Sequence, residues 1–365
     1  MRLLKNVLLI LAAPLLFGSG VGCKMKADSS SESSQSGGET GGGSSAGVPL
    51  KPADFQRAYR RASVIFLRSS PSLDQLQSVV DRDSYNQAIR ELVDNPAFVS
   101  TMRTYHQAFF EMSGMEDDIN YDEPANLAAY LIRENMDFRD ILRATYCVNN
   151  DLERIDCSSF EGNTQMQDTY AAGVITTQAF LRNWESSFNF VRTRETLKAF
   201  GCEEYPDSTD AGMTRREVET GVHTWECTNC VPSCYSCHST MNARATLFYD
   251  FDINGVFDLD PPNRTRTLND EGGPSQRTDL LIEGAAPRFN GQVMNNLRDY
   301  ALALSDTPKF TQCLARRLTL YSIGGDLEAS LPESMSFVTQ MMRDNGFQVR
   351  EFYYNLLKRD EYVRH

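Results

Sequence analysis

Cys234, Cys237 and His238 have the residue types and spacing with the clearest chemical meaning in this chain, because they form the pattern C-x-x-C-H. Two thiols at this spacing can each form a thioether with a vinyl group of haem, and the imidazole that follows can ligate the iron. The pattern therefore predicts one covalently bound haem c, with Cys234 and Cys237 as anchors and His238 as the proximal ligand. In an exported protein this pattern indicates haem attachment specifically, whereas in the cytosol the same thiols could exchange disulfides or bind zinc.

A second C-x-x-C pair, Cys227 and Cys230, leaves two alternatives to haem open. The four thiols could hold zinc or an iron–sulfur cluster, or they could form plain disulfides. Three residues separate the two pairs, whereas zinc ribbons normally have about 15 to 20 residues between them. The spacing therefore disfavours a metal site made of four thiolates.

The N-terminus predicts export. Arg2 and Lys5 precede an apolar run at 7–17, and small residues lead from there to Cys23. The apolar run is shorter than the roughly 20 residues that a membrane-spanning helix needs. We therefore expect residues 1–22 to be a lipoprotein signal peptide rather than a membrane span.

The residues around Cys23 resemble the lipobox of bacterial lipoproteins, although Gly20 stands where Leu is usual. Lys24 follows the Cys, whereas Asp is common there in lipoproteins that stay at the inner membrane. We expect lipidation of Cys23 and a lipid-anchored protein of the bacterial cell envelope, at the outer membrane and either periplasmic or surface-exposed. Ordinary cleavage that leaves Cys23 as a spare thiol is the alternative.

The charge of the chain limits its partners. The formal net charge is −13, and because residues 1–46 hold four basic and three acidic side chains, the remainder carries −14. Such a surface argues against nucleic acid or anionic lipid as a partner of the globular part. We expect instead a redox partner protein that offers a basic docking patch.

The remaining cysteines agree with an oxidising compartment. Setting aside Cys23 and the two haem anchors leaves six, an even number that could form three disulfides. Proximity in the sequence favours pairing of Cys147 with Cys157, and the other four stay open.

Most of the chain is predicted to be helical, because apolar residues recur at intervals of three and four. One clear stripe runs from Phe98 to Met112, and we interpret it as core packing rather than as a cofactor site. The expected helices cover 52–67, 73–80, 85–93, 98–112, 126–133, 138–146, 176–184, 188–200, 292–304, 309–321, 335–343 and 349–358.

The stretch from Cys234 to Gly255 resembles the planctomycete-type cytochrome c domain family, because C-x-x-C-H is followed there by Phe251-Asp252-x-x-Gly255. The pattern Cys313-x-x-Arg316-x-Leu318-x-x-Tyr321-x-x-Gly324 and the closing segment 337–357 are similar to the end of these domains. The chain departs from the family at Asn242-Ala243, where Asp-Pro is usual, and at Gly325, where Arg is common. The resemblance implies covalent haem and export.

The expected organisation has four parts. A signal peptide (1–22) and a Ser/Gly-rich flexible tether (23–47) precede a helical domain (48–205). The last part (206–365) is expected to be a helical, cytochrome c-like haem domain with closing helices. The fold class is thus mainly α.

The sequence identifies the sixth ligand of the haem iron less clearly than it identifies the proximal ligand. Met294 lies well downstream of His238, as the distal Met does in small cytochromes c, and it is our candidate for the distal ligand. His223 and His106 are the histidine alternatives. Packing of Met294 against the helix that follows is the competing interpretation.

The segment that follows the haem pattern has side-chain oxygens at positions 1, 3, 5 and 9 of a calcium loop, from Asp250, Asp252, Asn254 and Asp258. Gly255 stands at position 6, where a sharp turn is needed, but position 12 is Pro261 rather than Glu. The pattern makes Ca²⁺ a second candidate cofactor. The alternative is a tight acidic turn beside the haem.

These residues favour a membrane-anchored mono-haem c-type cytochrome that transfers single electrons and is an electron carrier rather than a catalyst. Two other classes stay open. One is a haem-containing oxidoreductase subunit, and the other is a lipoprotein binding module whose helical half recognises a partner or substrate.

Overall fold

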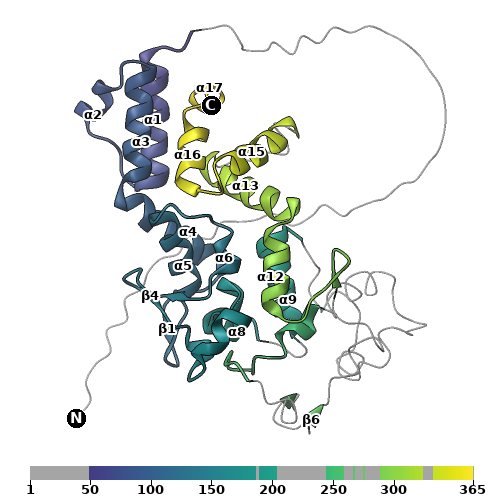
Figure 1. Ribbon diagram of the computed structural model, residues 1–365. Coiled ribbons are helices and arrows are strands. Elements are labelled where there is room, and N and C mark those ends of the chain that lie inside the picture. The colour runs from purple at the N-terminus through teal and green to yellow at the C-terminus, as the bar shows by residue number, and fades with distance from the viewer. Residues whose placement is uncertain are drawn as a thin grey trace, which may run out of the picture. The chain divides into compact units, whose positions relative to one another are not determined.

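The computed structural model describes residues 49–185, 189–203, 244–258, 266–267, 274–275, 288–323 and 332–364. These residues are mainly helical, which confirms the expected fold class (Figure 1). The strands that occur among them are two residues long and form two-stranded antiparallel pairs.

Five helices open the described chain. Polar residues cap three of them: Ser72, Asp81 and Asn95 each accept a hydrogen bond from a backbone N–H of the helix that follows. The helices are α1 (Pro52–Leu67), α2 (Leu73–Ser78), α3 (Arg82–Asp94), α4 (Pro96–Phe110) and α5 (Glu123–Arg133).

The middle of the chain is built from short pieces. Two hairpins, β1 (Met115–Glu116) with β2 (Ile119–Asn120) and β3 (Cys147–Val148) with β4 (Arg154–Ile155), flank short helical turns. The α-helices here are α6 (Asp140–Arg143), α7 (Gln167–Tyr170), α8 (Gln178–Asn183) and α9 (Phe190–Gly201), and the 3-10 turns are η1 (Ser158–Phe160), η2 (Thr164–Met166), η3 (Gly173–Thr176) and η5 (Thr246–Phe248).

Helices return towards the C-terminus. Strand pairs come first: β5 (Arg266–Thr267) with β6 (Pro274–Ser275), and β7 (Arg288–Phe289) with β8 (Gln292–Val293). The helices are α12 (Leu297–Ser305), α13 (Pro308–Ile323), α15 (Pro332–Asp344), α16 (Val349–Leu357) and α17 (Asp360–Arg364).

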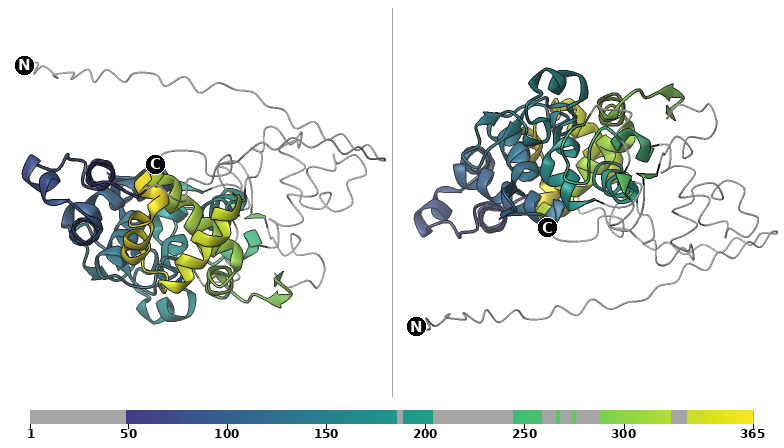
Figure 2. Two further views of the ribbon diagram at one scale, coloured as in Figure 1. Left: turned by 90° about the horizontal axis from the view of Figure 1, so that it is seen from above. Right: turned by 90° about the horizontal axis from the view of Figure 1, so that it is seen from below.

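Helices from the two expected domains share one hydrophobic core. α1 packs against α3 and α17, α3 against α16, α6 against α12, and α9 against α13. Figures 1 and 2 show the closing helices beside the first ones. The rings of Phe66, Phe98 and Tyr353 meet in this core, with centroids 4.7–5.8 Å apart. The expected boundary at residue 205 lies outside the described residues, and the described parts on its two sides are not separate cores.

The stripe on α4 serves this core, as expected. Phe98 and Met102 are fully buried, while Tyr105 and Phe109 are partly buried and pack against the core. Two expected helices differ most from the prediction, because a strand takes up part of each expected range. The range 138–146 contains only α6 before β3 begins, and 292–304 begins with strand β8 before Asn296 caps α12.

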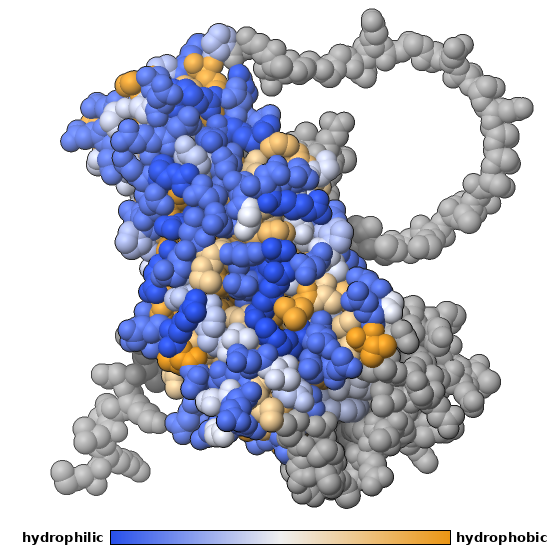
Figure 3. Space-filling view, viewed as in Figure 1, coloured by the Kyte–Doolittle hydropathy of each residue, from blue (hydrophilic) through white to orange (hydrophobic). Residues whose placement is uncertain are grey.

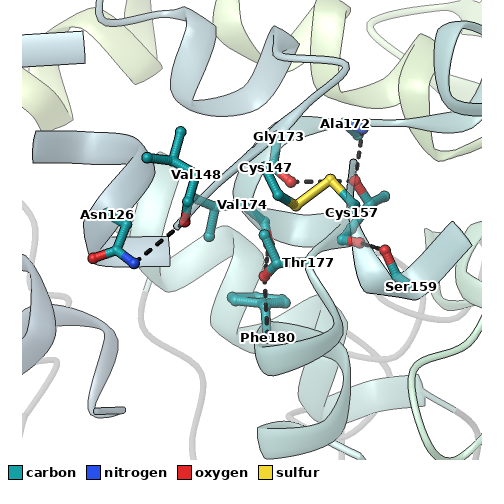
Figure 4. The surroundings of a disulfide bond; sticks show 11 residues. Asn126, Cys147, Val148, Cys157, Ser159, Ala172, Gly173, Val174, Thr177 and Phe180 are labelled. Carbon is teal, nitrogen blue, oxygen red and sulfur yellow. Dashed lines mark hydrogen bonds between the residues drawn. A yellow bond between two sulfur atoms is a disulfide. The ribbon is translucent and has the colours of Figure 1, made fainter. Parts of the chain in front are cut away.

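Two disulfides lie in the described part of the chain. Cys147 and Cys157 are bonded, which confirms the pairing expected from proximity, and Cys202 is bonded to Cys313. The first closes the β3–β4 region beside η1 and η3, where Ser159 donates to the Thr176 carbonyl and Asn126 to that of Val148 (Figure 4). The second joins the end of α9 to α13.

The face seen in Figure 3 is mostly hydrophilic, with small scattered apolar areas. Among the described residues, no helix is both long enough and apolar enough to cross a bilayer.

The two disulfides should differ in their contribution to stability. Replacing Cys202 and Cys313 together by Ser should lower the free energy of unfolding by about 4 kcal/mol, because their loop spans 111 positions. The matched variant Cys147→Ser, Cys157→Ser removes a disulfide between residues 10 positions apart. Its free energy of unfolding should fall by an amount that is about 1 to 2 kcal/mol smaller. Urea unfolding of both variants checks this, and a larger loss for the short loop would contradict it.

Candidate functional site

The predicted haem anchors lie outside the described residues. This holds for Cys234, Cys237 and His238, for Cys23, and for the alternative thiols and imidazole at 227, 230 and 223. The structure does describe the segment that follows the haem pattern, the candidate ligand Met294, and His106.

The segment 244–258 begins six residues after His238 and is held firmly in the core. Ala245, Phe248 and Phe251 are buried. The Phe251 ring meets Phe160 edge-on, at 5.8 Å between centroids, and Phe257 packs on Tyr170 at 4.8 Å. The residues after the haem pattern are therefore anchored on the middle of the chain.

Asp252 shapes the turn within this segment. Its Oδ1 accepts hydrogen bonds from the backbone N–H groups of Asn254 and Val256, both at 2.8 Å. Phe251 pairs with Phe257 across the turn, and Gly255 adopts φ +74°. This is a tight acidic turn closed by a carboxylate.

The calcium prediction finds no ligand cluster in this turn. In the described part of the chain, no three His, Cys, Asp or Glu side chains gather into a group that could hold a metal, so Asp250, Asp252 and Asp258 do not converge. The backbone carbonyls of Ile253 and Asn254 accept hydrogen bonds from Arg182 and Gln178. These contacts account for the Asp252 carboxylate and for the carbonyls of Ile253 and Asn254, and Ca²⁺ binding stays a prediction.

The turn fits closely against α8 and α9. The fully buried Arg192 of α9 donates to the Asp252 carbonyl at 3.0 Å and to the Leu181 carbonyl of α8 at 2.7 Å. A Cβ on Gly255 would lie 2.9 Å from both the Gln178 carbonyl oxygen and Leu181 Cβ. Only glycine suits this position, because both the positive φ and the close approach exclude a side chain.

Gly255→Ala should therefore lower the free energy of unfolding by about 3 kcal/mol, the sum of left-handed strain and overpacking. Gly291→Ala is the matched control, because Gly291 also has a positive φ, of +81°, but nothing lies within 4 Å of its added Cβ. It should lose only about 1 kcal/mol. Equal losses of stability in Gly255→Ala and Gly291→Ala, measured by thermal or urea unfolding, would show that contact with α8 adds nothing to the effect of the new side chain at position 255.

Met294 lies between β8 and α12 and is buried, with 4 % of its surface exposed. It belongs to the hydrophobic core, as the packing interpretation expects. Phe289 and Tyr300, which lie near it in sequence, belong to a cluster of two aromatic rings and one cation.

Arg244, Phe289 and Tyr300 form this cluster. The guanidinium carbon of Arg244 lies 5.2 Å from the centre of the Phe289 ring and 5.9 Å from that of Tyr300, and the two rings meet edge-on at 5.2 Å. Burial raises the pKa of the Tyr300 hydroxyl well above its usual range. The Arg244 charge opposes that rise, and the Glu203 carboxylate adds to it.

Two polar atoms of this cluster have no partner. Arg244 Nη1 and Tyr300 Oη are buried, and neither forms a hydrogen bond among the residues that the structure describes. The sequence pattern did not single these residues out. The feature of the sequence that could have indicated Arg244 is its position, because it is a cation six residues after His238.

His106 is buried in the aromatic core on α4. Its Nδ1 lies 2.7 Å from the Met102 carbonyl, and its ring borders a cavity of about 30 Å³ together with Phe138, Phe200 and Arg317. Burial lowers the pKa of His106 to about 4, so the imidazole is neutral at physiological pH. The hydrogen bond assigns the proton to Nδ1 and leaves Nε2 as an acceptor. Met294 does not border this cavity.

Glu123 is a second buried titratable group that sequence reasoning missed. Burial raises the pKa of its carboxyl to about 7, although the Ala179 backbone N–H donates to it, and Oε2 has no partner. A carboxyl at the start of a helix is an ordinary sequence feature, so no local signal distinguishes Glu123 from an exposed one.

Glu123 should make stability fall as pH rises. Its pKa is higher in the folded chain than its ordinary value of 4.5, so the stabilisation is complete below about pH 4.5 and is lost as pH rises through about 7. Wild type should therefore lose about 3 kcal/mol relative to Glu123→Gln over this range. Urea unfolding at pH 4.5 to 8 measures the difference, with the exposed Glu116→Gln as control. Parallel profiles for wild type and Glu123→Gln would contradict the burial argument.

No protein-family model, curated protein or solved structure matches this chain.

Proposed function

We propose that this chain is a mono-haem c-type cytochrome, held at the cell envelope by lipid on Cys23, that transfers single electrons. The observation that carries the proposal is C-x-x-C-H at Cys234–His238 in a chain whose N-terminus reads as a lipoprotein signal peptide. Export makes haem attachment the expected use of these thiols.

The disulfides support export. Cys147–Cys157 and Cys202–Cys313 are bonds of the kind that form and persist in oxidising compartments. They also use four of the six cysteines left after lipid and haem attachment, which leaves Cys227 and Cys230 as the remaining pair.

The chain has residues that suit a bound haem. Cys234 and Cys237 would hold it through thioethers, and His238 would ligate the iron from the proximal side. The haem, when bound, supplies the ferric–ferrous couple. Met294 is our candidate distal ligand, and the histidine alternatives are His223 and the neutral Nε2 of His106.

The protein's own contribution is to hold and shield the cofactor. The turn at Asp252–Val256 is hydrogen-bonded internally and is docked on α8 and α9, so the segment from Phe248 to Asp258 has a fixed position. Little reorganisation of this segment is then needed when the iron changes its charge. The acidic net charge favours docking on a basic patch of the redox partner.

A pyridine haemochrome spectrum tests the proposal. The full-length chain, produced in a host with c-type maturation and denatured before assay, should give a stoichiometric c-type α-band. The band should vanish in Cys234→Ala, Cys237→Ala, because these thiols form the thioethers. The matched variant Cys227→Ala, Cys230→Ala removes a C-x-x-C pair of equal spacing and should keep the band.

Absence of covalent haem in the exported wild type would overturn the proposal. Loss of the band in the Cys227 and Cys230 variant as well, with normal export, would assign those thiols to the cofactor and contradict the role of Cys234 and Cys237 as its only anchors.

A further inference from the structure

Arg244 and Tyr300 leave two buried hydrogen-bond donors unused. Arg244 Nη1 and Tyr300 Oη have no partner among the described residues, and Tyr300 is 1 % exposed. Leaving such donors unsatisfied destabilises the folded chain, and a charged donor does so more than a neutral one. Buried polar groups are normally bonded, so an unpaired pair in one cluster points to a ligand.

The donors define the chemistry of that ligand. A guanidinium and a tyrosine hydroxyl both donate, and the guanidinium carries a full positive charge. The complementary group is a carboxylate, which guanidinium binds with charge-assisted hydrogen bonds. Phe289 and Tyr300 lie beside the guanidinium within cation–π distance, at 5.2 and 5.9 Å from its carbon to the ring centres.

We propose that Arg244 and Tyr300 bind a propionate carboxylate of the covalently attached haem, an inference that rests on the proposed function. Arg244 is six residues after His238, and six residues span at most roughly 20 Å. A haem fixed at Cys234, Cys237 and His238 is therefore tethered within reach of this cluster. The haem carries its own carboxylates, whereas the carboxylate of Glu203, whose charge also acts on Tyr300, is paired with Lys309 at 2.5 Å.

This contact would tune the iron. A propionate near the iron favours the ferric state by its negative charge, and a guanidinium that neutralises it removes part of that bias. Arg244 should therefore raise the reduction potential and should keep the propionate ionised across the physiological pH range.

The test measures the reduction potential of the full-length haem protein by spectroelectrochemical titration between pH 5 and 9. Arg244→Gln should lower the potential and should introduce a pH dependence near neutrality, as the propionate loses its cation. Tyr300→Phe should lower the potential by a smaller amount, because it removes only a neutral donor. Arg244→Lys retains the charge and should restore most of the wild-type value.

A second arginine–tyrosine pair gives matched controls. Arg154 lies 4.1 Å from the centre of the Tyr146 ring, and Tyr146 Oη is likewise buried without a partner. Arg154→Gln and Tyr146→Phe should leave the potential and its pH profile unchanged, because Arg154 is exposed and already donates to Tyr130 Oη at 2.7 Å.

The outcomes separate this inference from the proposed function. A c-type α-band with the same potential and pH profile in wild type, Arg244→Gln and Tyr300→Phe would overturn the propionate contact and leave the cytochrome standing. Equal shifts in the Arg154 and Tyr146 controls would also overturn it, because they would report a general charge effect. A wild type without haem would overturn both.

Discussion

A buried arginine holds together the segments of this protein that the proposed function requires to keep fixed positions. Arg192 has no exposed surface, and its guanidinium donates to the Leu181 carbonyl, the Asn189 side chain and the Asp252 carbonyl. A buried cation is costly unless its donors are satisfied, so these three segments must meet at one place. The Asp252 turn is thereby fixed to α8 and α9, and Gly255 can approach α8 because it has no side chain. The segment after the haem pattern is consequently part of the main core rather than an appended loop.

Much of the helical scaffold could be predicted from the sequence, since apolar periodicity and caps act locally. α1 has the predicted bounds, Pro52–Leu67, and α4 follows the cap at Asn95. The short helix α6 and the strand β8 could not be predicted, because apolar runs of that length are compatible with helix or strand. Packing between the first and last helices was equally inaccessible, because it joins residues about 270 positions apart, as in the hydrogen bond from Tyr85 to the Leu357 carbonyl.

The candidate site, like the fold, could be predicted from the sequence only in part. The C-x-x-C-H pattern is chemical information that is complete in five adjacent residues, so the sequence alone carries the haem prediction. The acidic pattern at 250–258 also has the spacing of a ligand loop, but the Asp252 carboxylate is used by backbone N–H groups of its own turn. Spacing cannot distinguish these two uses. Arg244 and Tyr300 become notable only when burial and missing partners are known, and both depend on the tertiary structure.

The central claim is that one haem is bound covalently to this chain through Cys234 and Cys237. Intact mass spectrometry of the full-length protein under denaturing conditions, after production with c-type maturation, tests it most directly, because thioether bonds survive denaturation and axial ligation does not. The account predicts a single species heavier than the mature polypeptide by one haem, in addition to any lipid. A mass that corresponds to the processed polypeptide without haem would contradict it.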